Sequence, residues 1–448
     1  MLLVLLVLVL CAAAGIGAYA TTRAARHVDA APSTTPPPPP PSAYLGASDA
    51  PTPAPTPTST PDRAAGVTRA LAAPLAAGGL GQRVRATVLD VTTGVALLDR
   101  TGAVPAAPAS TAKLLTAAAL LTVRQPTDRI TTTVRAGANG AVVLVGGGDP
   151  TLSGATTGDP PYAGAARLRD LASQLRAAGV RPTRVLVDDS LFTGPDVSPS
   201  WAAEDVPTDY GAAITAVMTD GGRDTPDATI RSATPDLAAG HELAAALGVP
   251  DAPVARGRAA AGATTLARVR SAPFATLIGQ MLQESDNVIA ECLARQVALT
   301  EHRAPSFLGA AASVRTVLTG IGLDPGAGLV DGSGLAAADR VSPRVLAGVL
   351  RAVATRPGLS AIVGGLPVAA WSGTLADRYV TGSARSGAGI VRAKTGTLSG
   401  VSALAGLVHD RSGRLLAFAI IADRAGSTAA AEAALDAVAA RLADCGCG

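Results

Sequence analysis

The stretch that decides the fold lies at residues 108–121, which have the sequence PASTAKLLTAAALL. Ser110 stands three positions before Lys113, and the residues after them are almost wholly apolar. We predict a helix at Thr111–Val123. Residues at i and i+3 share one face of a helix, so the serine hydroxyl and the lysine amine come within reach of each other. A helix that is apolar all round is buried, and burial lowers the pKa of an amine toward that of a useful base.

The lysine of this stretch is one of only two in the chain. The 448 residues contain 37 lysines and arginines, and only Lys113 and Lys394 are lysines. Arginine supplies a permanent charge but cannot serve as a proton acceptor, because its pKa stays above about 12. Two lysines in a chain that otherwise uses arginine indicate a chemical role for an amine at those sites. Chance survival of two lysines is the alternative.

Two further motifs contain residue types that suit such chemistry. Ser285-Asp286-Asn287 opens a predicted helix at Asn287–Leu299, where an ordinary N-cap is the simpler interpretation if the motif is taken alone. Lys394-Thr395-Gly396-Thr397 follows a predicted strand at Gly389–Ala393. Its glycine would let a substrate backbone come close to the strand edge, and its threonines offer hydroxyls for a carboxylate. The order S-x-x-K, S-D-N, K-T-G is the signature of penicillin-binding proteins and class A β-lactamases.

Composition excludes several other classes of protein. The net charge is +3 and aromatic residues make up 2% of the chain, without a basic stripe, so we expect no nucleic-acid partner. His241-Glu242 is not followed by a second histidine at zincin spacing, and we expect neither a metal nor a cofactor. Cys292 is interpreted as a core residue, whereas Cys445 and Cys447 are candidates for a disulfide outside the cell.

The first 61 residues have the composition of an export segment and a spacer. Residues 1–20 are apolar and end on Ala18-Tyr19-Ala20, which predicts a signal peptide or a membrane anchor. Residues 21–61 are rich in proline and threonine, and such a stretch is extended and cannot bury a core. We expect an extracytoplasmic protein that is held at the membrane or secreted, with its folded part facing the cell wall. A merely disordered leader is the alternative.

The rest of the chain predicts an α+β fold in which helices flank an antiparallel sheet, because strand hairpins occur near both ends of the folded part. The stretch 195–263 is rich in turns and gives no clear elements. Predicted strands are Arg83–Val91, Val95–Asp99, Ile130–Arg135, Ala141–Val145, Arg184–Asp188, Ser402–His409 and Leu415–Ile421. Further predicted helices are Gly66–Ala77, Ala163–Ala178, Ala272–Gln283, Phe307–Thr319, Pro343–Ala354 and Thr428–Ala443.

Taken together, the motifs make the chain resemble the class C low-molecular-mass penicillin-binding proteins, the D-alanyl-D-alanine carboxypeptidase/endopeptidase family (peptidase family S13). The likeness also rests on residues 146–152 (GGGDPTL), 331–335 (DGSGL), 372–375 (SGTL) with Arg378, and 400–406 (GVSALAG). It implies a penicillin-recognising domain split into residues 62–127 and 269–448, with an inserted, mostly β domain at 128–268. Ser285 follows Ser110 by 175 positions, which is shorter than in the best-known members of this family.

The resemblance assigns a role to each motif residue. It implies that Ser110 is the acylated nucleophile, Lys113 its base, Ser285 the proton relay to the leaving amine and Lys394 a source of positive potential. It implies that Asn287 holds the substrate's peptide group. Substrate binding by Thr395, Gly396 and Thr397 is implied as well, with the backbone N–H groups of Ser110 and Thr397 as the oxyanion hole.

The resemblance further suggests that Trp201, Glu204, Tyr210 and Leu335 line a pocket for the diamino-acid side chain of the stem peptide. One departure concerns this pocket. The family often has D-G-S-G-L-S-R, whereas Ala336-Ala337 follows Leu335 here. Without the arginine it is an open question how the free end of that side chain is held, and therefore whether cross-links are cleaved.

Three hypotheses follow. The first is a D,D-carboxypeptidase that acts on peptidoglycan stem peptides and is inhibited by β-lactams. Whether it also has endopeptidase activity is left open. A β-lactamase is the enzymatic alternative, but no glutamate can be assigned from sequence as the base for deacylating water. A non-catalytic wall-binding or β-lactam-binding protein is the third, and the intact serine and lysines argue against it.

Overall fold

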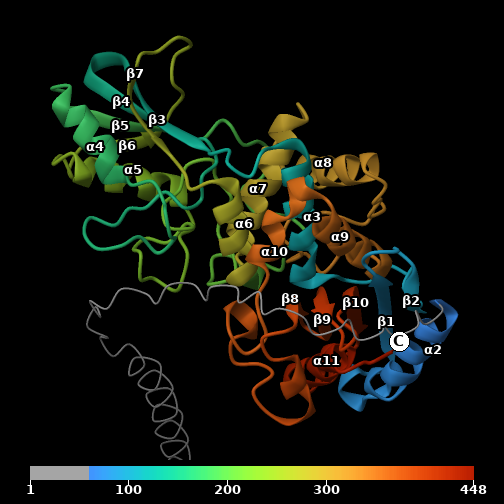
Figure 1. Cartoon of the computed structure of the whole chain (residues 1–448). Coiled ribbons are helices and arrows are strands. Elements are labelled where there is room, and N and C mark those ends of the chain that lie inside the picture. The colour runs from blue at the N-terminus through green and yellow to red at the C-terminus, as the bar shows by residue number, and fades with distance from the viewer. Residues whose placement is uncertain (1–59, 448) are drawn as a thin grey trace, which may run out of the picture. The chain divides into compact units, whose positions relative to one another are not determined.

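The central layer of the protein is an antiparallel sheet of five strands in the order β2-β1-β10-β9-β8 (Figure 1). The computed structural model describes residues 60–447, so the predicted export segment and most of the predicted spacer lie outside the described residues. The strands are Arg83–Asp90 (β1), Ala96–Arg100 (β2), Arg392–Leu398 (β8), Val401–His409 (β9) and Leu415–Asp423 (β10). β1 pairs with β10, so the two ends of the folded chain meet in one sheet.

Alternate residues of the central strands face opposite sides of this sheet, as the period of two in a strand requires. In β10, Ala417 and Ala419 belong to one apolar cluster, whereas Phe418 and Ile420 belong to another. Because both faces of β10 are buried, the strand is almost continuously apolar and does not alternate with polar residues. The predicted fold class, an antiparallel sheet flanked by helices, is confirmed.

Helices cover both faces of the sheet (Figure 1). One face is covered by the first and last helices, α2 (Thr60–Ala72) and α11 (Thr428–Ala443). The other face is covered by α9 (Pro343–Thr355), which packs on β1, β9 and β10. The apolar cluster on this side continues into further helices from the middle of the chain: α3 (Lys113–Val123), α6 (Phe274–Gln283), α7 (Asn287–Thr300), α8 (Phe307–Gly320) and α10 (Ala361–Gly365).

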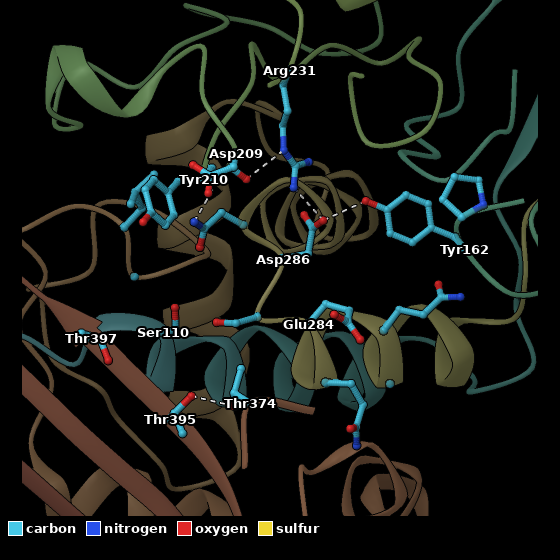
Figure 2. Close-up of a pocket in the computed structure, with 18 of the residues that line it drawn as sticks. Ser110, Tyr162, Asp209, Tyr210, Arg231, Glu284, Asp286, Thr374, Thr395 and Thr397 are labelled. Carbon is cyan, nitrogen blue, oxygen red and sulfur yellow. Dashed lines mark hydrogen bonds and ion pairs between the residues drawn. The ribbon is translucent and has the colours of Figure 1, made fainter. Parts of the chain in front are cut away.

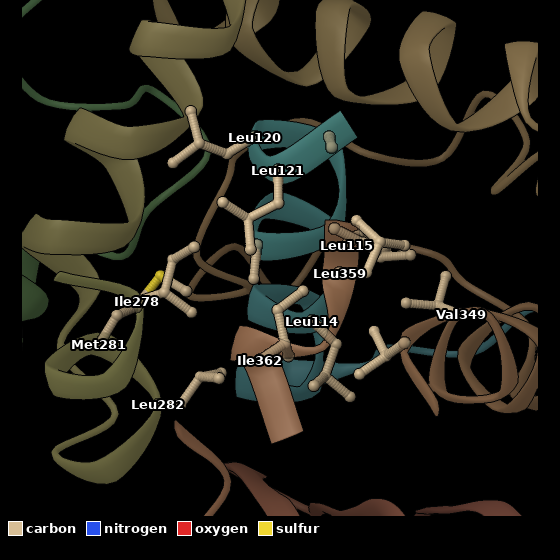
Figure 3. Packing of buried hydrophobic residues seen from close by; sticks show 14 of the residues in the cluster. Leu114, Leu115, Leu120, Leu121, Ile278, Met281, Leu282, Val349, Leu359 and Ile362 are labelled. Atoms are coloured by element: carbon tan, nitrogen blue, oxygen red, sulfur yellow. The ribbon is translucent and has the colours of Figure 1, made fainter. Parts of the chain in front are cut away.

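Helix α3 lies at the centre of this second layer. Nine of its eleven residues are buried, including Lys113 at its first position. Figure 3 shows Leu114 and Leu115 of α3 among side chains of the neighbouring helices, such as Ile278 of α6 and Val349 of α9. Burial of one such leucine stabilises the fold by roughly 1.5–3 kcal/mol. The helix that carries the first motif is thus fixed from several sides, which confirms the predicted burial.

A second sheet is built from strands in the order β6-β5-β4-β3-β7. Its strands are Thr131–Ala136 (β3), Ala141–Val145 (β4), Arg184–Asp188 (β5), Val254–Arg256 (β6) and Thr265–Arg270 (β7). β4, β5 and β6 run parallel, and the helices α4 (Leu168–Ala177) and α5 (Pro235–Ala246) pack against the sheet. The region predicted to be mostly β therefore contains helices as well, because parallel strands need crossover connections.

Several element boundaries differ from the predictions. α2 begins at Thr60 and ends at Ala72 instead of spanning 66–77. α4 begins at Leu168 rather than at 163, because Arg167 is extended and pairs with Ser153. α5 was not predicted. The strand predicted at 389–393 is found at Arg392–Leu398, so it includes the third motif. Cys445 and Cys447 are paired as predicted, with Cα atoms 5.0 Å apart.

Within residues 60–447, no single helix is long and apolar enough to cross a membrane. One pair of helices, 343–355 with 357–365, passes by length and composition only when taken together, and it is bent by 105°.

Candidate active site

The first motif forms a tight turn that leads into α3. Ser110 lies in a 3-10 turn, Ala109–Ala112, and Ala109 before it has a φ of 47°. Lys113 is the first residue of α3, and its Nζ lies 2.9 Å from Ser110 Oγ. The structure therefore brings the serine hydroxyl and the lysine amine together, as the i, i+3 spacing predicted.

The Lys113 amine is buried and held by three oxygen atoms. Besides Ser110, its Nζ donates to Asn287 Oδ1 at 2.6 Å and to the Ser333 carbonyl at 2.9 Å. These two oxygens only accept, so each requires an N–H of the amine. When Lys113 is neutral, its lone pair therefore points at Ser110, the one partner that can donate a proton. The geometry aims the base at the nucleophile.

Burial also adjusts the basicity of this amine. Lys113 is fully buried, and this desolvation lowers its pKa to about 8, against the attraction of nearby acids such as Asp331 and Asp286. A general base works best with a pKa near the operating pH. Near neutral pH, Lys113 therefore loses its proton at a lower free-energy cost than an exposed lysine, whose pKa is near 10.5.

The segment 331–335 fixes the carbonyl that holds Lys113. Asp331 Oδ1 accepts hydrogen bonds from the backbone N–H groups of Ser333 and Gly334, at 3.0 and 2.6 Å. Asp331 Oδ2 accepts from Ala336 N–H and from Trp201 Nε1–H, each at 2.8 Å. This D-G-S-G turn thus orients the Ser333 carbonyl toward the catalytic amine.

The second motif opens α7, as predicted. Asp286 is the N-cap, and its Oδ1 accepts from the N–H groups of Val288 and Ile289. Ser285 has a φ of 56°, and its Oγ accepts a hydrogen bond of 2.9 Å from Lys394 Nζ. Asn287 Nδ2 donates to the Tyr210 carbonyl at 3.0 Å. The second motif therefore touches both lysines, Lys113 through Asn287 and Lys394 through Ser285.

We had predicted the third motif at the end of a strand, but the structure places it inside β8. Lys394 is fully buried, and its Nζ donates to Ser285 Oγ and to the Thr395 carbonyl, each at 2.9 Å. Burial, together with the positive charges of Lys113 and Arg378, lowers the pKa of Lys394 well below its usual 10.5. The lowered pKa makes this amine a weaker base than an exposed lysine.

Gly396 has a packing role that the sequence did not indicate. A Cβ at this position would lie 2.7 Å from the Pro108 carbonyl and 3.2 Å from the Ser110 backbone nitrogen. The missing side chain thus lets β8 approach the turn that carries the nucleophile. The predicted close approach of a substrate backbone to this strand edge stays a prediction.

The free edge of β8 faces the site. β8 is the last strand of its sheet, and the Ala393 N–H donates to the Pro367 carbonyl instead of to β9. Successive N–H groups of a strand alternate in direction, so those of Thr395 and Thr397 point to the same free edge. This direction agrees with the predicted part of the Thr397 N–H in an oxyanion hole.

A cavity of about 1190 Å³ opens above these groups (Figure 2). Ser110, Ser285, Asn287, Thr395 and Thr397 line it, together with Tyr210 and Leu335 from the predicted side-chain pocket. Lys113 and Lys394 lie behind the lining, because neither is accessible to solvent. The serine and threonine residues thus form the cavity wall, and the amines of Lys113 and Lys394 lie buried behind it.

Two predicted pocket residues do not line this cavity. Trp201 is buried, packs edge-on against Phe307 with ring centroids 5.0 Å apart and donates to Asp331. Its role is to hold the D-G-S-G turn. Glu204 is exposed in a short 3-10 turn, Ala203–Asp205, and is also absent from the cavity wall. Neither side chain lines the cavity as the structure shows it, and contact of these two residues with substrate stays a prediction.

Comparison with known proteins agrees with this geometry. A model of the D-Ala-D-Ala carboxypeptidase 3 (S13) family matches residues 67–230 and 224–444. The chain belongs to this family. The S13 membership confirms the resemblance drawn from the motifs and the predicted class of enzyme, a D-Ala-D-Ala carboxypeptidase.

Individual relatives cover most of the S13 chain. The carboxypeptidase DacB of Mycolicibacterium smegmatis is 47% identical over 393 residues, 86% of this chain and 85% of the relative. A carboxypeptidase of Mycobacterium tuberculosis is 45% identical over 394 residues, with the same two shares. The crystal structure of penicillin binding protein 4 from Haemophilus influenzae matches with a TM-score of 0.68 at 20% identity, covering 84% of this chain and 97% of that one. Its complex with a β-lactam matches with a TM-score of 0.60 at 20% identity and the same coverage.

Sequence reasoning missed a buried cluster that supports the second motif of this S13 enzyme. Asp286 Oδ2 accepts from Arg231 Nη2 at 2.9 Å and from the Tyr162 hydroxyl at 2.8 Å (Figure 2). Arg223 donates to the same hydroxyl. Burial alone would raise the pKa of Asp286, but the Arg231 guanidinium together with the hydrogen bonds from Ile289 N–H and Tyr162 outweighs burial and holds that pKa well below its usual range. No short motif signals these contacts, since more than fifty residues separate Arg231 from Asp286.

Sequence reasoning also missed residues beside the third motif. The Thr395 hydroxyl donates to Thr374 Oγ1 at 2.8 Å. Arg378 forms a bidentate pair with Asp436 of α11, at 2.9 and 2.6 Å, and lies with Thr374 in the cavity wall. The S-G-T-L segment and Arg378 had been noted as part of the resemblance, which was the signal available for them.

Proposed function

We propose that the protein removes the terminal D-alanine of peptidoglycan stem peptides through an acyl-enzyme on Ser110. The observation that carries this proposal is the position of the Lys113 amine, 2.9 Å from Ser110 Oγ and held by two further oxygens that can only accept. A buried amine with a pKa of about 8 can take the hydroxyl proton at the moment of attack.

Acylation would proceed in one balanced exchange. Ser110 Oγ forms a bond to the carbonyl carbon of the penultimate D-alanine while its proton passes to Lys113. The developing oxyanion accepts hydrogen bonds from the N–H groups of Ser110 and Thr397. The C–N bond then breaks, and the leaving amine takes a proton from Ser285, which is hydrogen-bonded to Lys394. Ser285 regains a proton through the hydrogen-bonded groups of the site as the Lys113 ammonium gives up the one that it took from Ser110. Water then attacks the ester carbonyl carbon, the C–O bond to Ser110 breaks, and one water proton passes by way of Lys113 to Ser110 Oγ, which releases the shortened peptide.

The hydroxyl groups of β8 would bind the terminal carboxylate of the substrate. Thr395 and Thr397 both line the cavity, and on binding the Thr395 hydroxyl would donate to the carboxylate while it accepts a hydrogen bond from the Thr374 hydroxyl. A carboxylate at this place would also favour the protonated form of the Lys394 amine. On the opposite wall, Asn287 would hold the peptide group of the substrate, and Tyr210 and Leu335 would contact its remaining part.

The same nucleophile would be acylated by β-lactam antibiotics, as the β-lactam complex of the Haemophilus relative supports. We place the enzyme outside the cytoplasm, facing the cell wall, with the N-terminal segment as its membrane attachment. We also propose the division into a split peptidase domain, 62–127 with 269–448, and an insertion at 128–268. The strands β3 to β7 fall at residues 131–270 and the strands β1, β2 and β8 to β10 outside them.

The test is product analysis by mass spectrometry on purified muramyl pentapeptide and on cross-linked dimer. We expect loss of one D-alanine from the pentapeptide with wild-type enzyme and no loss with Ser110→Ala. Cleavage of the dimer would add endopeptidase activity. Rapid turnover of penicillin without release of D-alanine would instead identify a β-lactamase. If the protein catalyses neither reaction, it is a binding protein.

A further inference from the structure

A buried carboxyl group that the proposed reaction does not use lies behind the turn at residues 331–334. It belongs to Asp339, which is fully buried. Its Oδ1 accepts a hydrogen bond of 2.7 Å from the Val330 N–H. Its Oδ2 is buried as well, and no N–H or O–H group of residues 60–447 donates to it. The Arg340 guanidinium donates to the Asp339 backbone carbonyl and not to the carboxyl group. Because buried polar atoms are normally paired, this oxygen requires an explanation.

The neighbour of this carboxyl group is a second carboxyl group, that of Asp331. The two lie within hydrogen-bonding range of each other, and Asp331 is buried as well. Two ionised carboxylates in contact repel each other, so one of the pair holds a proton. Asp331 accepts four N–H hydrogen bonds, which use the lone pairs of a carboxylate and favour its charged form. The proton therefore belongs on Asp339, whose Oδ2 can carry it.

The surroundings of Asp339 agree with a neutral acid. Burial, together with the Asp331 carboxylate, raises the pKa of Asp339 to about 10. The other titratable groups that face it are Glu291 of α7 and Lys113 of α3. Glu291 has Arg295 as its own partner at 3.4 Å, and the Lys113 amine is held by three other oxygen atoms. Ionisation of Asp339 would therefore add a buried carboxylate that pairs with no cation of the described chain.

Asp331 connects this pair of acids to the base. Its hydrogen bonds hold the turn whose Ser333 carbonyl accepts from Lys113 Nζ at 2.9 Å. Its charge also favours the ammonium form of Lys113. Two other acids near Lys113 act in the same sense, but each pairs with a buried arginine. The unpaired negative charge beside the base thus depends on whether Asp339 keeps its proton.

We propose that Asp339 is a positioning residue for the Lys113 base. As a neutral acid it donates a hydrogen bond to the Asp331 carboxylate, steadies the turn that holds the amine, and limits the unpaired negative charge beside Lys113 to a single carboxylate. This role rests on the proposed function, in which Lys113 takes the proton of Ser110. A second negative charge at this place would hold the proton on Lys113 more tightly and leave less neutral amine near neutral pH.

The first arm of the test measures the pH dependence of acylation by a chromogenic β-lactam. Asp339→Asn keeps a neutral donor for Asp331 and an acceptor for the Val330 N–H, so the midpoint should stay within about 0.3 pH unit of the wild type and the plateau rate within about 2-fold. Asp339→Leu removes both, and its plateau rate should fall at least about 10-fold. Asp410→Asn is the matched control, because Asp410 accepts from backbone N–H groups in the turn between β9 and β10 and does not line the cavity.

Two results of this arm would overturn the proposal. A midpoint that falls by more than about 0.5 pH unit in Asp339→Asn would show that the wild-type side chain is charged, because removal of a negative charge lowers the pKa of a nearby amine. A wild-type plateau rate in Asp339→Leu would show that the side chain positions nothing. If the leucine variant does not fold, Asp339→Asn and the second arm still decide.

The second arm detects the proton without catalysis. The infrared difference spectrum of the wild type minus Asp339→Asn, taken at about pH 8, should contain the C=O band of a protonated carboxyl group, because an ordinary aspartate is ionised at that pH. Absence of this band would overturn the proposal. A wild-type enzyme that is not acylated, or whose acylation rate does not vary with pH, would instead contradict the proposed function. The infrared band distinguishes the two failures, because it does not depend on turnover.

Discussion

Arg231 and Asp286 form an ion pair with an Nη2 to Oδ2 distance of 2.9 Å, and only 3% and 4% of their side chains are exposed. Arg231 comes from the stretch before α5, where the sequence showed no clear elements. Asp286 caps the helix that presents Asn287 to Lys113. The pair thus ties the proposed insertion to the catalytic site, and the Tyr162 hydroxyl joins it at 2.8 Å.

Removal of Arg231 should weaken both stability and activity. Arg231→Leu leaves the Asp286 carboxylate buried without its cation, so the free energy of unfolding should fall by roughly 3–5 kcal/mol. Denaturant unfolding measures this loss. Asp286→Asn keeps an oxygen for the N-cap but removes the charge. In a double-mutant cycle the two changes should couple by more than about 1 kcal/mol, and simple additivity would show that the pair does not act as a unit.

Substitution of Gly396 should separate β8 from the nucleophile turn. A Cβ at this site would meet the Pro108 carbonyl at 2.7 Å, so Gly396→Ala requires the backbone to move. We expect the acylation rate by penicillin to drop about 100-fold or more, since small displacements of a positioned group have effects of that size. Gly320→Ala at the end of α8 is the control, because its Cβ would meet nothing within 4 Å. Equal acylation rates in the two variants would contradict this account of Gly396.

The acylation rate should rise with pH through the titration of Lys113. The neutral amine is the active form, and the pKa of Lys113 is lowered to about 8 by burial. Below that pKa the neutral fraction falls about tenfold per pH unit, so the rate at pH 6 should be about 100-fold below the plateau above pH 9. Stopped-flow acylation by a chromogenic β-lactam measures it. A rate that still rises steeply at pH 10 would indicate an unshifted amine, and a flat profile would exclude Lys113 as the base.

Thr374 should affect substrate binding through Thr395. The Thr395 hydroxyl donates to Thr374 Oγ1 at 2.8 Å, which fixes one of the groups that would bind the terminal carboxylate. Thr374→Val removes the hydroxyl that would donate to Thr395 when Thr395 donates to the carboxylate, but it keeps the shape, and we expect KM for the pentapeptide to rise about 3- to 10-fold. Thr374→Ser should restore most of the wild-type KM. If valine and serine behave alike, the hydroxyl at position 374 has no part in binding.

The three motifs were predictable from sequence because each has a local cause. Ser110 and Lys113 are one helical turn apart, and the apolar residues after them predicted the burial that lowers the lysine's pKa. The order of the motifs and the family resemblance then placed Ser285, Asn287 and Lys394 in the same site, and the structure brings all five together.

Other features depend on contacts between distant segments and could not be predicted. The contact of Gly396 with Pro108 and the ion pair of Arg231 with Asp286 leave no trace in local sequence. Trp201 was assigned to a pocket by resemblance, yet its indole turns inward to Asp331. α5 was missed because its apolar residues follow a long, turn-rich stretch, and only its packing on the second sheet reveals its role.

The central claim is that Ser110 is acylated with Lys113 as its base, and peptide mapping of the penicillin-treated enzyme tests it most directly. After digestion, mass spectrometry should locate the penicilloyl adduct on the peptide that contains Ser110. The account predicts that the adduct is lost in Ser110→Ala and that Lys113→Arg acylates at least about 100-fold more slowly, because a guanidinium cannot accept the proton. An adduct on another serine, or acylation of Lys113→Arg at the wild-type rate, would contradict it.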